Sequence, residues 1–188
     1  MPTTRTSGLV LAAGGSARLG RPKQLVPFRG ATLLDHVLAV ARACPFEQRV
    51  VALGGHAGEV RAGVDLRGFE VVVNEAYGSG CSSSIAAALD VVDGDVLVLM
   101  LGDQPGVAAD TVRELLQGRG DAPLAACLYE DGLGHPLAFA RSLFGELRAL
   151  HGDRGVWKLV DRGPVAEVPV AGRIPRDVDT EADVAALR

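Results

Sequence analysis

Aromatic side chains are scarce in this 188-residue chain: they make up 4% of it, although 48% of the residues are hydrophobic. The core must therefore be built from aliphatic side chains such as Val, Leu and Ala. That composition favours a parallel sheet with closely packed helices over an aromatic-rich β-sandwich. At this length, one domain that buries roughly two-thirds of its unfolded surface is the simplest arrangement.

Basic runs and long apolar runs are also missing. The formal net charge is -4 and no cluster of Lys and Arg stands out, which argues against nucleic-acid binding. No apolar stretch approaches the ~20 residues of a membrane span, and the first eight residues hold no apolar segment of the secretory kind. We therefore expect a soluble, cytoplasmic protein that binds neither nucleic acid nor membrane.

The three cysteines, Cys44, Cys81 and Cys127, are widely spaced and form no C-x-x-C pair. An odd and dispersed set argues against a disulfide framework and against a zinc site. We interpret all three as small, buried, apolar side chains.

Strand-like and helix-like segments alternate along the first two-thirds of the chain. This order predicts right-handed βαβ units and so an α/β fold: a single-domain, doubly wound, mostly parallel sheet with helices on both faces. Thr32 is a plausible N-cap of the first helix, and Gly118 is predicted to end the third. The predicted strands are the apolar runs 8–13, 49–54, 69–74 and 95–101, and the predicted helices are 31–44, 82–92 and 108–118.

The stretch "LVLAAGGSARLGRPKQLVPF" joins a predicted buried strand to a loop rich in glycine and cations. A dinucleotide-binding G-x-G-x-x-G does not fit, because Gly14 and Gly15 are adjacent and the next glycine is Gly20. A P-loop does not fit either, because Arg21-Pro22-Lys23 follows Gly20 where Lys-Ser/Thr is required. Neither common phosphate motif is present.

The same loop can still bind an anion. The N–H groups of Gly14, Gly15 and Ser16 can turn toward one, and Arg18 and Lys23 can bring positive charge to the same place. The alternative is a solvated turn whose cations face water. In both cases we expect the loop to face solvent.

The pattern L-A-A-G-x-S-x-R-L-G-x-x-K-x-L resembles the opening of the molybdenum cofactor cytidylyltransferases, within the MobA-like NTP transferase superfamily. The resemblance implies a Rossmann-like nucleotidyltransferase fold, with residues 1–120 as the NTP-binding half and residues 121–188 as the acceptor-side half. It also implies that the loop wraps a triphosphate and that Arg18 and Lys23 act in catalysis. The nucleotide-binding residues implied in this loop are Leu11, Ala12, Ala13, Gly14, Gly15, Ser16 and Gly20.

Two carboxylates are candidates for a divalent metal site. Asp103 directly follows the most apolar predicted strand, where an aspartate otherwise caps a helix or forms a turn. Near the C-terminus, Asp177 can cap a turn, and Thr180 with Asp183 is predicted to form a capping box, which leaves Asp179 without a capping role. The resemblance places the ligands of magnesium, or of manganese in its place, at Asp103 and Asp179.

The serines after the third predicted strand can bond a nucleobase edge or simply cap the next helix. The resemblance implies base recognition here, in the pattern of cytidylyltransferases, with Cys81 in place of the usual methionine. The implied residues are Asn74, Gly80, Ser82 and Ser84.

The segments "GLGHPL" and "HGDRG" resemble those that border a pterin acceptor in the same family. They imply acceptor contacts at His135, Pro136, Asp153 and Gly155. A lone histidine in such a turn is otherwise a surface residue. Trp157 is either a core residue or a stacking surface, and we interpret His36 and His56 as structural.

The combined prediction is a magnesium-dependent cytidylyltransferase. The terminal phosphate of a molybdopterin-type cofactor would attack CTP in line, without a strong general base. A molybdoenzyme or its chaperone would be a further partner. The alternatives are a GTP-dependent guanylyltransferase, a sugar- or polyol-phosphate nucleotidyltransferase, and a non-catalytic cofactor carrier, which would not need Lys23, Asp103 and Asp179.

Overall fold

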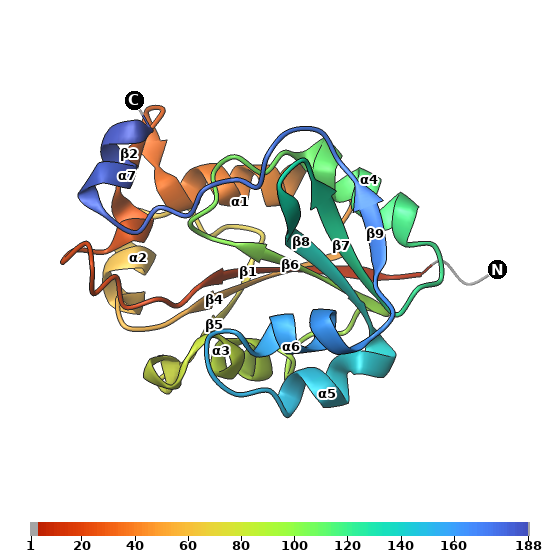
Figure 1. The fold of residues 1–188 in the computed structure, drawn as a ribbon. Helices are drawn as coiled ribbons and strands as arrows, with labels where there is room; N and C mark the ends of the chain where they lie inside the picture. The colour runs from red at the N-terminus through yellow and green to blue at the C-terminus, as the bar shows by residue number, and fades with distance from the viewer. Residues whose placement is uncertain (1–3, 188) are drawn as a thin grey trace.

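The computed structural model describes residues 4–187 and contains a seven-stranded sheet in the order β5-β4-β1-β6-β8-β7-β9 (Figure 1). Every strand runs parallel to its neighbours except β8, which is antiparallel to β6 and β7. The predicted mostly parallel α/β sheet is confirmed. The strand bounds are β1 Thr6–Ala12, β4 Gln48–Leu53, β5 Glu70–Val73, β6 Val96–Leu101, β7 Leu124–Tyr129, β8 Gly132–Ala140 and β9 Ala166–Pro169.

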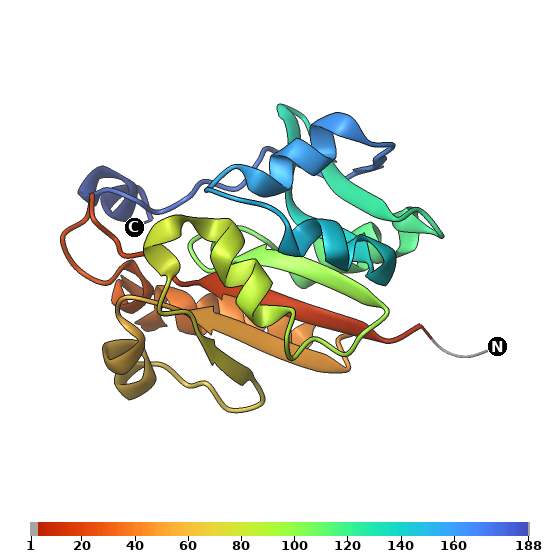
Figure 2. The same cartoon turned by 90° about the horizontal axis from the view of Figure 1, so that it is seen from below.

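Helices cover both faces of the sheet (Figures 1 and 2). In β1, Val10 packs into the core on one face and Leu9 into the core on the other, as expected of a strand buried on both sides. The first core contains α1 Leu33–Ala43, α2 Ala57–Gly63 and α4 Ala109–Arg119, and the second contains α3 Cys81–Ala88, α5 Phe144–Arg148 and α6 Gly155–Arg162. The short strands β2 Pro27–Phe28 and β3 Ala31–Thr32 pair beside α7 Glu181–Ala186.

Two helices begin where the sequence provides a capping side chain, whereas the end of α4 is set by packing. The side chain of Thr32 caps α1, and Thr180 and Asp183 form the predicted capping box of α7. The predicted end of the third helix is wrong, because α4 continues through Gly118 to Arg119. A Cβ at position 118 would lie 2.6 Å from the side chain of Val168, so this glycine serves close packing against β9.

The predicted helix 82–92 is also shorter than expected. It begins one residue earlier, at Cys81, and ends at Ala88, after which the chain turns toward β6. Cys44 and Cys127 are buried as predicted, but Cys81 is half-buried. It stands at the start of α3 and its side chain faces a cavity, so the expectation that it is a core residue is wrong.

The polar residues predicted from the sequence lie at the end of the sheet where the parallel strands finish, which we call the carboxyl edge. The parallel strands β1, β4, β5 and β6 end there, and β8 begins there because it runs in the opposite direction. The segment after β9 then crosses the same edge to reach α7 (Figure 1). It is held by bonds from the N–H of Val178 to the oxygen of Asp103, 3.0 Å, and from the N–H of Glu130 to the oxygen of Gly172, 2.9 Å. Within residues 4–187, no helix is long and apolar enough to cross a membrane.

Candidate functional site

The loop after β1 has the geometry of an anion-binding turn. Gly14 and Gly15 are exposed, and Ser16 adopts a positive φ of 53°. The hydroxyl of Ser16 accepts a 3.0 Å bond from the N–H of Lys23, which folds the loop back on itself. The N–H groups of Gly15 and Ser16 donate to no group in the described part of the chain, so they are free to face an anion.

Gln24, which the sequence analysis did not single out, holds this loop from beneath. Its amide nitrogen donates to the carbonyl oxygens of Ala12, 2.7 Å, and Gly14, 3.2 Å. The side chain is 3% exposed. His56 adds a bond from Nε2 to the carbonyl oxygen of Gly15, 3.2 Å, consistent with a structural role. The shape of the loop is therefore fixed by a buried amide that no phosphate-loop motif includes.

Four charged side chains meet beside the loop. Lys23 Nζ lies 2.5 Å from Asp103 and 2.8 Å from Asp179, and Arg18 donates to the other oxygen of Asp179 at 2.6 Å. The two carboxylates come from positions 76 residues apart, yet they share one ammonium group. All four residues were predicted from the sequence, and the structure brings them together.

The sequence predicts a solvent-facing Lys23, but its side chain is only 16% exposed. Burial by itself lowers the pKa of Lys23, but the charges and hydrogen bonds of Asp103 and Asp179 outweigh it, and the pKa is raised from its ordinary value. The ammonium group therefore stays protonated. Arg18, by contrast, is 71% exposed and is available to a ligand at the rim.

A cavity of about 620 Å³ opens over this cluster, and we call it the glycine-loop cavity. Tyr77, not predicted from the sequence, lines one side of this cavity. Its ring packs on Gly15, Gly54 and Gly55, where a Cβ atom at any of the three positions would contact the Tyr77 side chain. Of the predicted site residues, this cavity is lined by Leu11, Ala12, Ala13, Gly14, Gly15, Arg18, Lys23, Ser84, Asp103, Asp153 and Asp179.

The other predicted nucleotide-binding residues do not line the cavity. Asn74 donates to the hydroxyls of Ser83, 2.8 Å, and Ser84, 2.9 Å, so it orients the serine that does line the cavity. Ser82 is 1% exposed and donates to the carbonyl oxygen of Gly152, 2.6 Å. Gly80, Ser16 and Gly20 shape turns, with φ values of 107°, 53° and 71° respectively.

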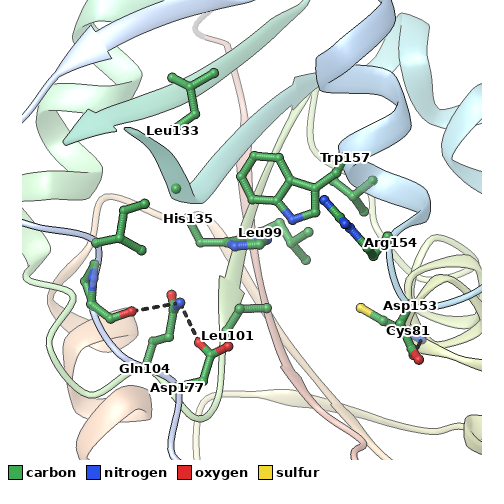
Figure 3. Close-up of a pocket in the computed structure, with 14 residues that line it drawn as sticks. Cys81, Leu99, Leu101, Gln104, Leu133, His135, Asp153, Arg154, Trp157 and Asp177 are labelled. Carbon is green, nitrogen blue, oxygen red and sulfur yellow. Dashed lines mark hydrogen bonds between the residues drawn. The ribbon is translucent and has the colours of Figure 1, made fainter. Parts of the chain in front are cut away.

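A second cavity of about 400 Å³, which we call the His135 cavity, adjoins the first (Figure 3). His135 and Trp157 meet edge-to-face in its wall, with ring centroids 5.3 Å apart. Trp157, left open between core and stacking surface, therefore faces a cavity. The two cavities share Cys81, Leu101, Asp153 and Asp177 as lining residues.

His135 is buried, not a surface residue: it is 8% exposed. Burial lowers its pKa to about 4, so the imidazole is neutral at neutral pH. A neutral imidazole can donate one hydrogen bond and accept another. Pro136 follows it through a cis peptide bond and is buried in β8.

Of the predicted acceptor residues, Asp153 lines both cavities and Gly155 lies beneath them. Asp153 accepts a 3.1 Å bond from the N–H of Cys81 at the start of α3. Gly155 packs so closely on α3 that a Cβ there would lie 2.2 Å from the hydroxyl of Ser82. Of these two, only Asp153 lines the cavities, and Gly155 sets the distance between α3 and α6.

Gln104 and Asp177 form the remaining polar side of the His135 cavity. Gln104 donates to Asp177 at 2.7 Å and to the carbonyl oxygen of Pro175 at 3.2 Å. Partial burial and the charge of Asp103 raise the pKa of Asp177. The sequence suggests that Asp177 caps a turn, but in the structure it accepts a bond from Gln104. No motif identified Gln104 in advance, although it directly follows Asp103.

Solved structures of high similarity cover nearly the whole chain. The crystal structure of Rv0371c from Mycobacterium tuberculosis H37Rv is 49% identical, with a TM-score of 0.92 over 98% of this chain and 97% of that one. A structure of Rv0371c in complex with manganese is 46% identical, with a TM-score of 0.89 over 98% of both chains.

Curated proteins add more distant relatives. Nicotine blue oxidoreductase of Paenarthrobacter nicotinovorans is 33% identical over 147 residues, which are 73% of this chain and 72% of that protein. The bifunctional protein GlmU of Stutzerimonas stutzeri (strain A1501) is 35% identical over 150 residues, and the match spans only 32% of its length. Residues 8–168 match the family model of the MobA-like NTP transferase domain. The chain therefore belongs to the MobA-like NTP transferase family and is a nucleotidyltransferase of that family.

Proposed function

We propose that the protein transfers CMP from CTP to a molybdopterin-type molybdenum cofactor and releases pyrophosphate. The observation that carries this proposal is the meeting of Lys23, Asp103 and Asp179 beside the glycine loop, next to a second cavity. Two adjoining cavities suit a reaction between two bound substrates, because each can hold one of them in position. The choice of CTP and of a pterin acceptor rests on the sequence patterns around Ser84 and His135.

The two halves of the chain would divide the work as the sequence suggests. Residues 1–120 supply the glycine loop, Lys23 and Asp103 on the CTP side. Residues 121–188 supply His135 and Trp157 on the acceptor side, and they return Asp179 to the CTP side. This return is what the crossing segment after β9 would accomplish.

The charged cluster suits a divalent metal ion. Lys23 Nζ already places a positive charge between Asp103 and Asp179, and carboxylate oxygens are the ligands that magnesium and manganese prefer. Within residues 4–187 no three His, Cys, Asp or Glu side chains are grouped closely enough to hold a metal by themselves. Phosphate oxygens and water would therefore complete the coordination. The manganese complex of Rv0371c supports the use of a divalent ion.

When bound, the metal would neutralise charge at the α-phosphate and on the departing pyrophosphate. The free N–H groups of the glycine loop and the guanidinium of Arg18 would hold the triphosphate. Lys23, kept protonated by its two carboxylates, would face the negative charge that develops during transfer.

The acceptor phosphate needs no strong base, because it is already ionised at neutral pH. One of its oxygens would form a bond to the α-phosphorus as the bond between that phosphorus and the pyrophosphate oxygen breaks. A neutral His135 agrees with this scheme, since it would position the acceptor by hydrogen bonding and would not remove a proton.

The test is product formation from purified protein, magnesium, molybdopterin cofactor and each NTP in turn. A cytosine dinucleotide cofactor and pyrophosphate from CTP are expected. Preferential use of GTP would make the protein a guanylyltransferase, and transfer only to sugar or polyol phosphates would overturn the pterin acceptor. Tight cofactor binding without turnover with any NTP would indicate a carrier.

A further inference from the structure

Gln104 presents a polar atom that the proposed reaction does not use. The residue is 4% exposed, and its amide nitrogen is committed to Pro175 and Asp177. Its oxygen Oε1 is buried and has no hydrogen-bond partner among residues 4–187. The amide cannot be turned over without losing both bonds, so the oxygen keeps its orientation. A buried oxygen without a partner costs free energy, and it marks a place where a ligand can supply the missing donor.

Asp177 places a second acceptor beside this oxygen. Its Oδ1 is taken by Gln104, and its Oδ2 is bonded to no other described side chain. Figure 3 shows Gln104 and Asp177 together on one side of the His135 cavity, with Trp157 and Arg154 across from them. The 2.7 Å bond between the two side chains fixes their spacing.

We propose that Gln104 and Asp177 form one recognition edge that selects an acceptor ring with two adjacent N–H donors. Such an edge occurs in a 2-amino-4-oxopyrimidine ring, where a ring N–H lies next to an exocyclic amino group. Gln104 Oε1 accepts from one donor and Asp177 Oδ2 from the other. The inference rests on the proposed function, because it specifies how the acceptor would be chosen.

The recognition edge lies next to the proposed transfer site. Gln104 directly follows Asp103, and Asp177 lies two residues before Asp179, so both members sit on the segments that carry the charged cluster. Asp177 also lines both cavities. A ring bound at the edge therefore lies next to the glycine-loop cavity, with the aromatic ring of Trp157, held edge-to-face by His135, lining the same cavity. The two residues are specificity determinants, and they take no part in bond making.

The test measures ring binding directly, without turnover. The probes are pterin, which has both donors, and lumazine, which has an oxygen in place of the 2-amino group. Trp157 is the only tryptophan of the chain and lines the cavity, so quenching of its emission reports occupancy. We expect the wild type to bind pterin at least about tenfold more tightly than lumazine.

Asp177→Asn is the decisive variant. Asparagine still accepts the bond from Gln104 through its oxygen, but it presents an N–H group where the second acceptor was, so the preference for pterin should disappear. Gln104→Met, which removes Oε1, should weaken pterin binding at least about tenfold. Asp161→Asn, an exposed change on α6, is the matched control and should change neither ring affinity.

Equal binding of the two rings by the wild type, no binding of either, or an unchanged preference in Asp177→Asn would overturn the recognition edge. These outcomes are separate from failure of the proposed function. A pterin preference that Asp177→Asn abolishes, without CMP transfer, would leave the edge in place and remove the transferase proposal. CMP transfer without a pterin preference would support the transferase proposal and overturn the recognition edge.

Discussion

The two cavities lie at the same edge of the sheet but are built in different ways. About half of the residues that line the glycine-loop cavity come from residues 11–24, and the rest, among them Asp103 and Asp179, come from elsewhere in the chain. The His135 cavity draws its wall from β6, β8, α6 and the segment after β9, and no short stretch supplies more than a few of its residues. A long loop leaves one extended motif in the sequence, whereas a cavity assembled from separate segments leaves only short ones, such as those around His135 and Asp153.

Burial also has opposite consequences in the two cavities. Lys23 and His135 both lose solvent, and in both cases burial disfavours the charged form. Lys23 keeps its charge because Asp103 and Asp179 lie against it, and its pKa is raised. His135 is affected by burial alone, and its pKa falls to about 4. The neighbours of a buried group, more than burial itself, decide whether a cavity is charged.

The strongest test of the charged cavity is Asp103→Asn. Turnover should fall about a thousandfold, equal to about 4 kcal/mol, because under the proposed mechanism the variant would lose a ligand of the ion that stabilises charge on the phosphates. Adding Asp179→Asn should reduce turnover by much less than a second such factor, since both residues are proposed to hold the same ion. Steady-state kinetics with magnesium and circular dichroism of the fold provide the measurements. Near-normal turnover in either single variant would remove that residue from the site.

The neutral cavity is tested by pH. Between pH 6.5 and pH 4 the unfolded chain protonates His135 and the folded chain does not, so the free energy of unfolding should fall as the pH is lowered through this window. Between pH 7 and pH 4.5 the loss due to this residue is about 2.5 kcal/mol. Urea unfolding at pH 7 and pH 4.5 measures it in the wild type and in His135→Gln, whose loss should be smaller by that amount.

His151→Gln, an exposed histidine change, is the control and should follow the wild type. If His135→Gln and the wild type lose stability equally between these pH values, His135 is not held neutral by the fold.

Lys23→Met sharpens the contrast between the two cavities by removing the charge at the centre of the first. Turnover should fall about a hundredfold, or about 2.7 kcal/mol, because a cation facing developing negative charge is lost. Asp103 and Asp179 would then repel each other in the absence of metal. Magnesium should therefore raise the melting temperature of this variant more than that of the wild type.

Lys158→Met, which changes the other lysine of the chain at an exposed site on α6, should leave turnover and the magnesium response unchanged. A variant at position 23 with normal turnover but reduced stability would assign Lys23 a purely structural role.

The smallest expected effect concerns the base. CTP should be preferred over GTP by at least about tenfold in kcat/KM, or about 1.4 kcal/mol, because a purine would leave polar groups around Ser84 unpaired. Ser84→Ala should narrow this ratio without changing the magnesium dependence. Ser79→Ala is the matched control, since the exposed Ser79 hydroxyl donates to the carbonyl oxygen of Ala76 and forms no hydrogen bond with Asn74 or Ser84. Equal use of GTP by the wild type would contradict the cytidine assignment.

Much of the fold could be predicted from the sequence because its signals are local. Runs of Val and Leu indicate the four parallel strands, and Thr32 and Thr180 indicate helix starts that the structure confirms. The end of α4 could not be predicted in this way. Gly118 has the local character of a helix stop, but its position is decided by Val168 on a strand 50 residues away.

The sequence by itself determined the sheet class, the glycine loop and the candidacy of Lys23, Asp103 and Asp179, since each depends on nearby residue types or on a motif. Only the tertiary structure decided that the two aspartates share one ammonium group, that Ser84 faces the cavity while Ser82 does not, and that Gln24 and Gln104 each commit an amide nitrogen while leaving an oxygen free. The physical reason is that burial and hydrogen-bond partners arise from segments that meet only after the sheet has formed. A glutamine carries no local signal of the carbonyl group or carboxylate that will bind it.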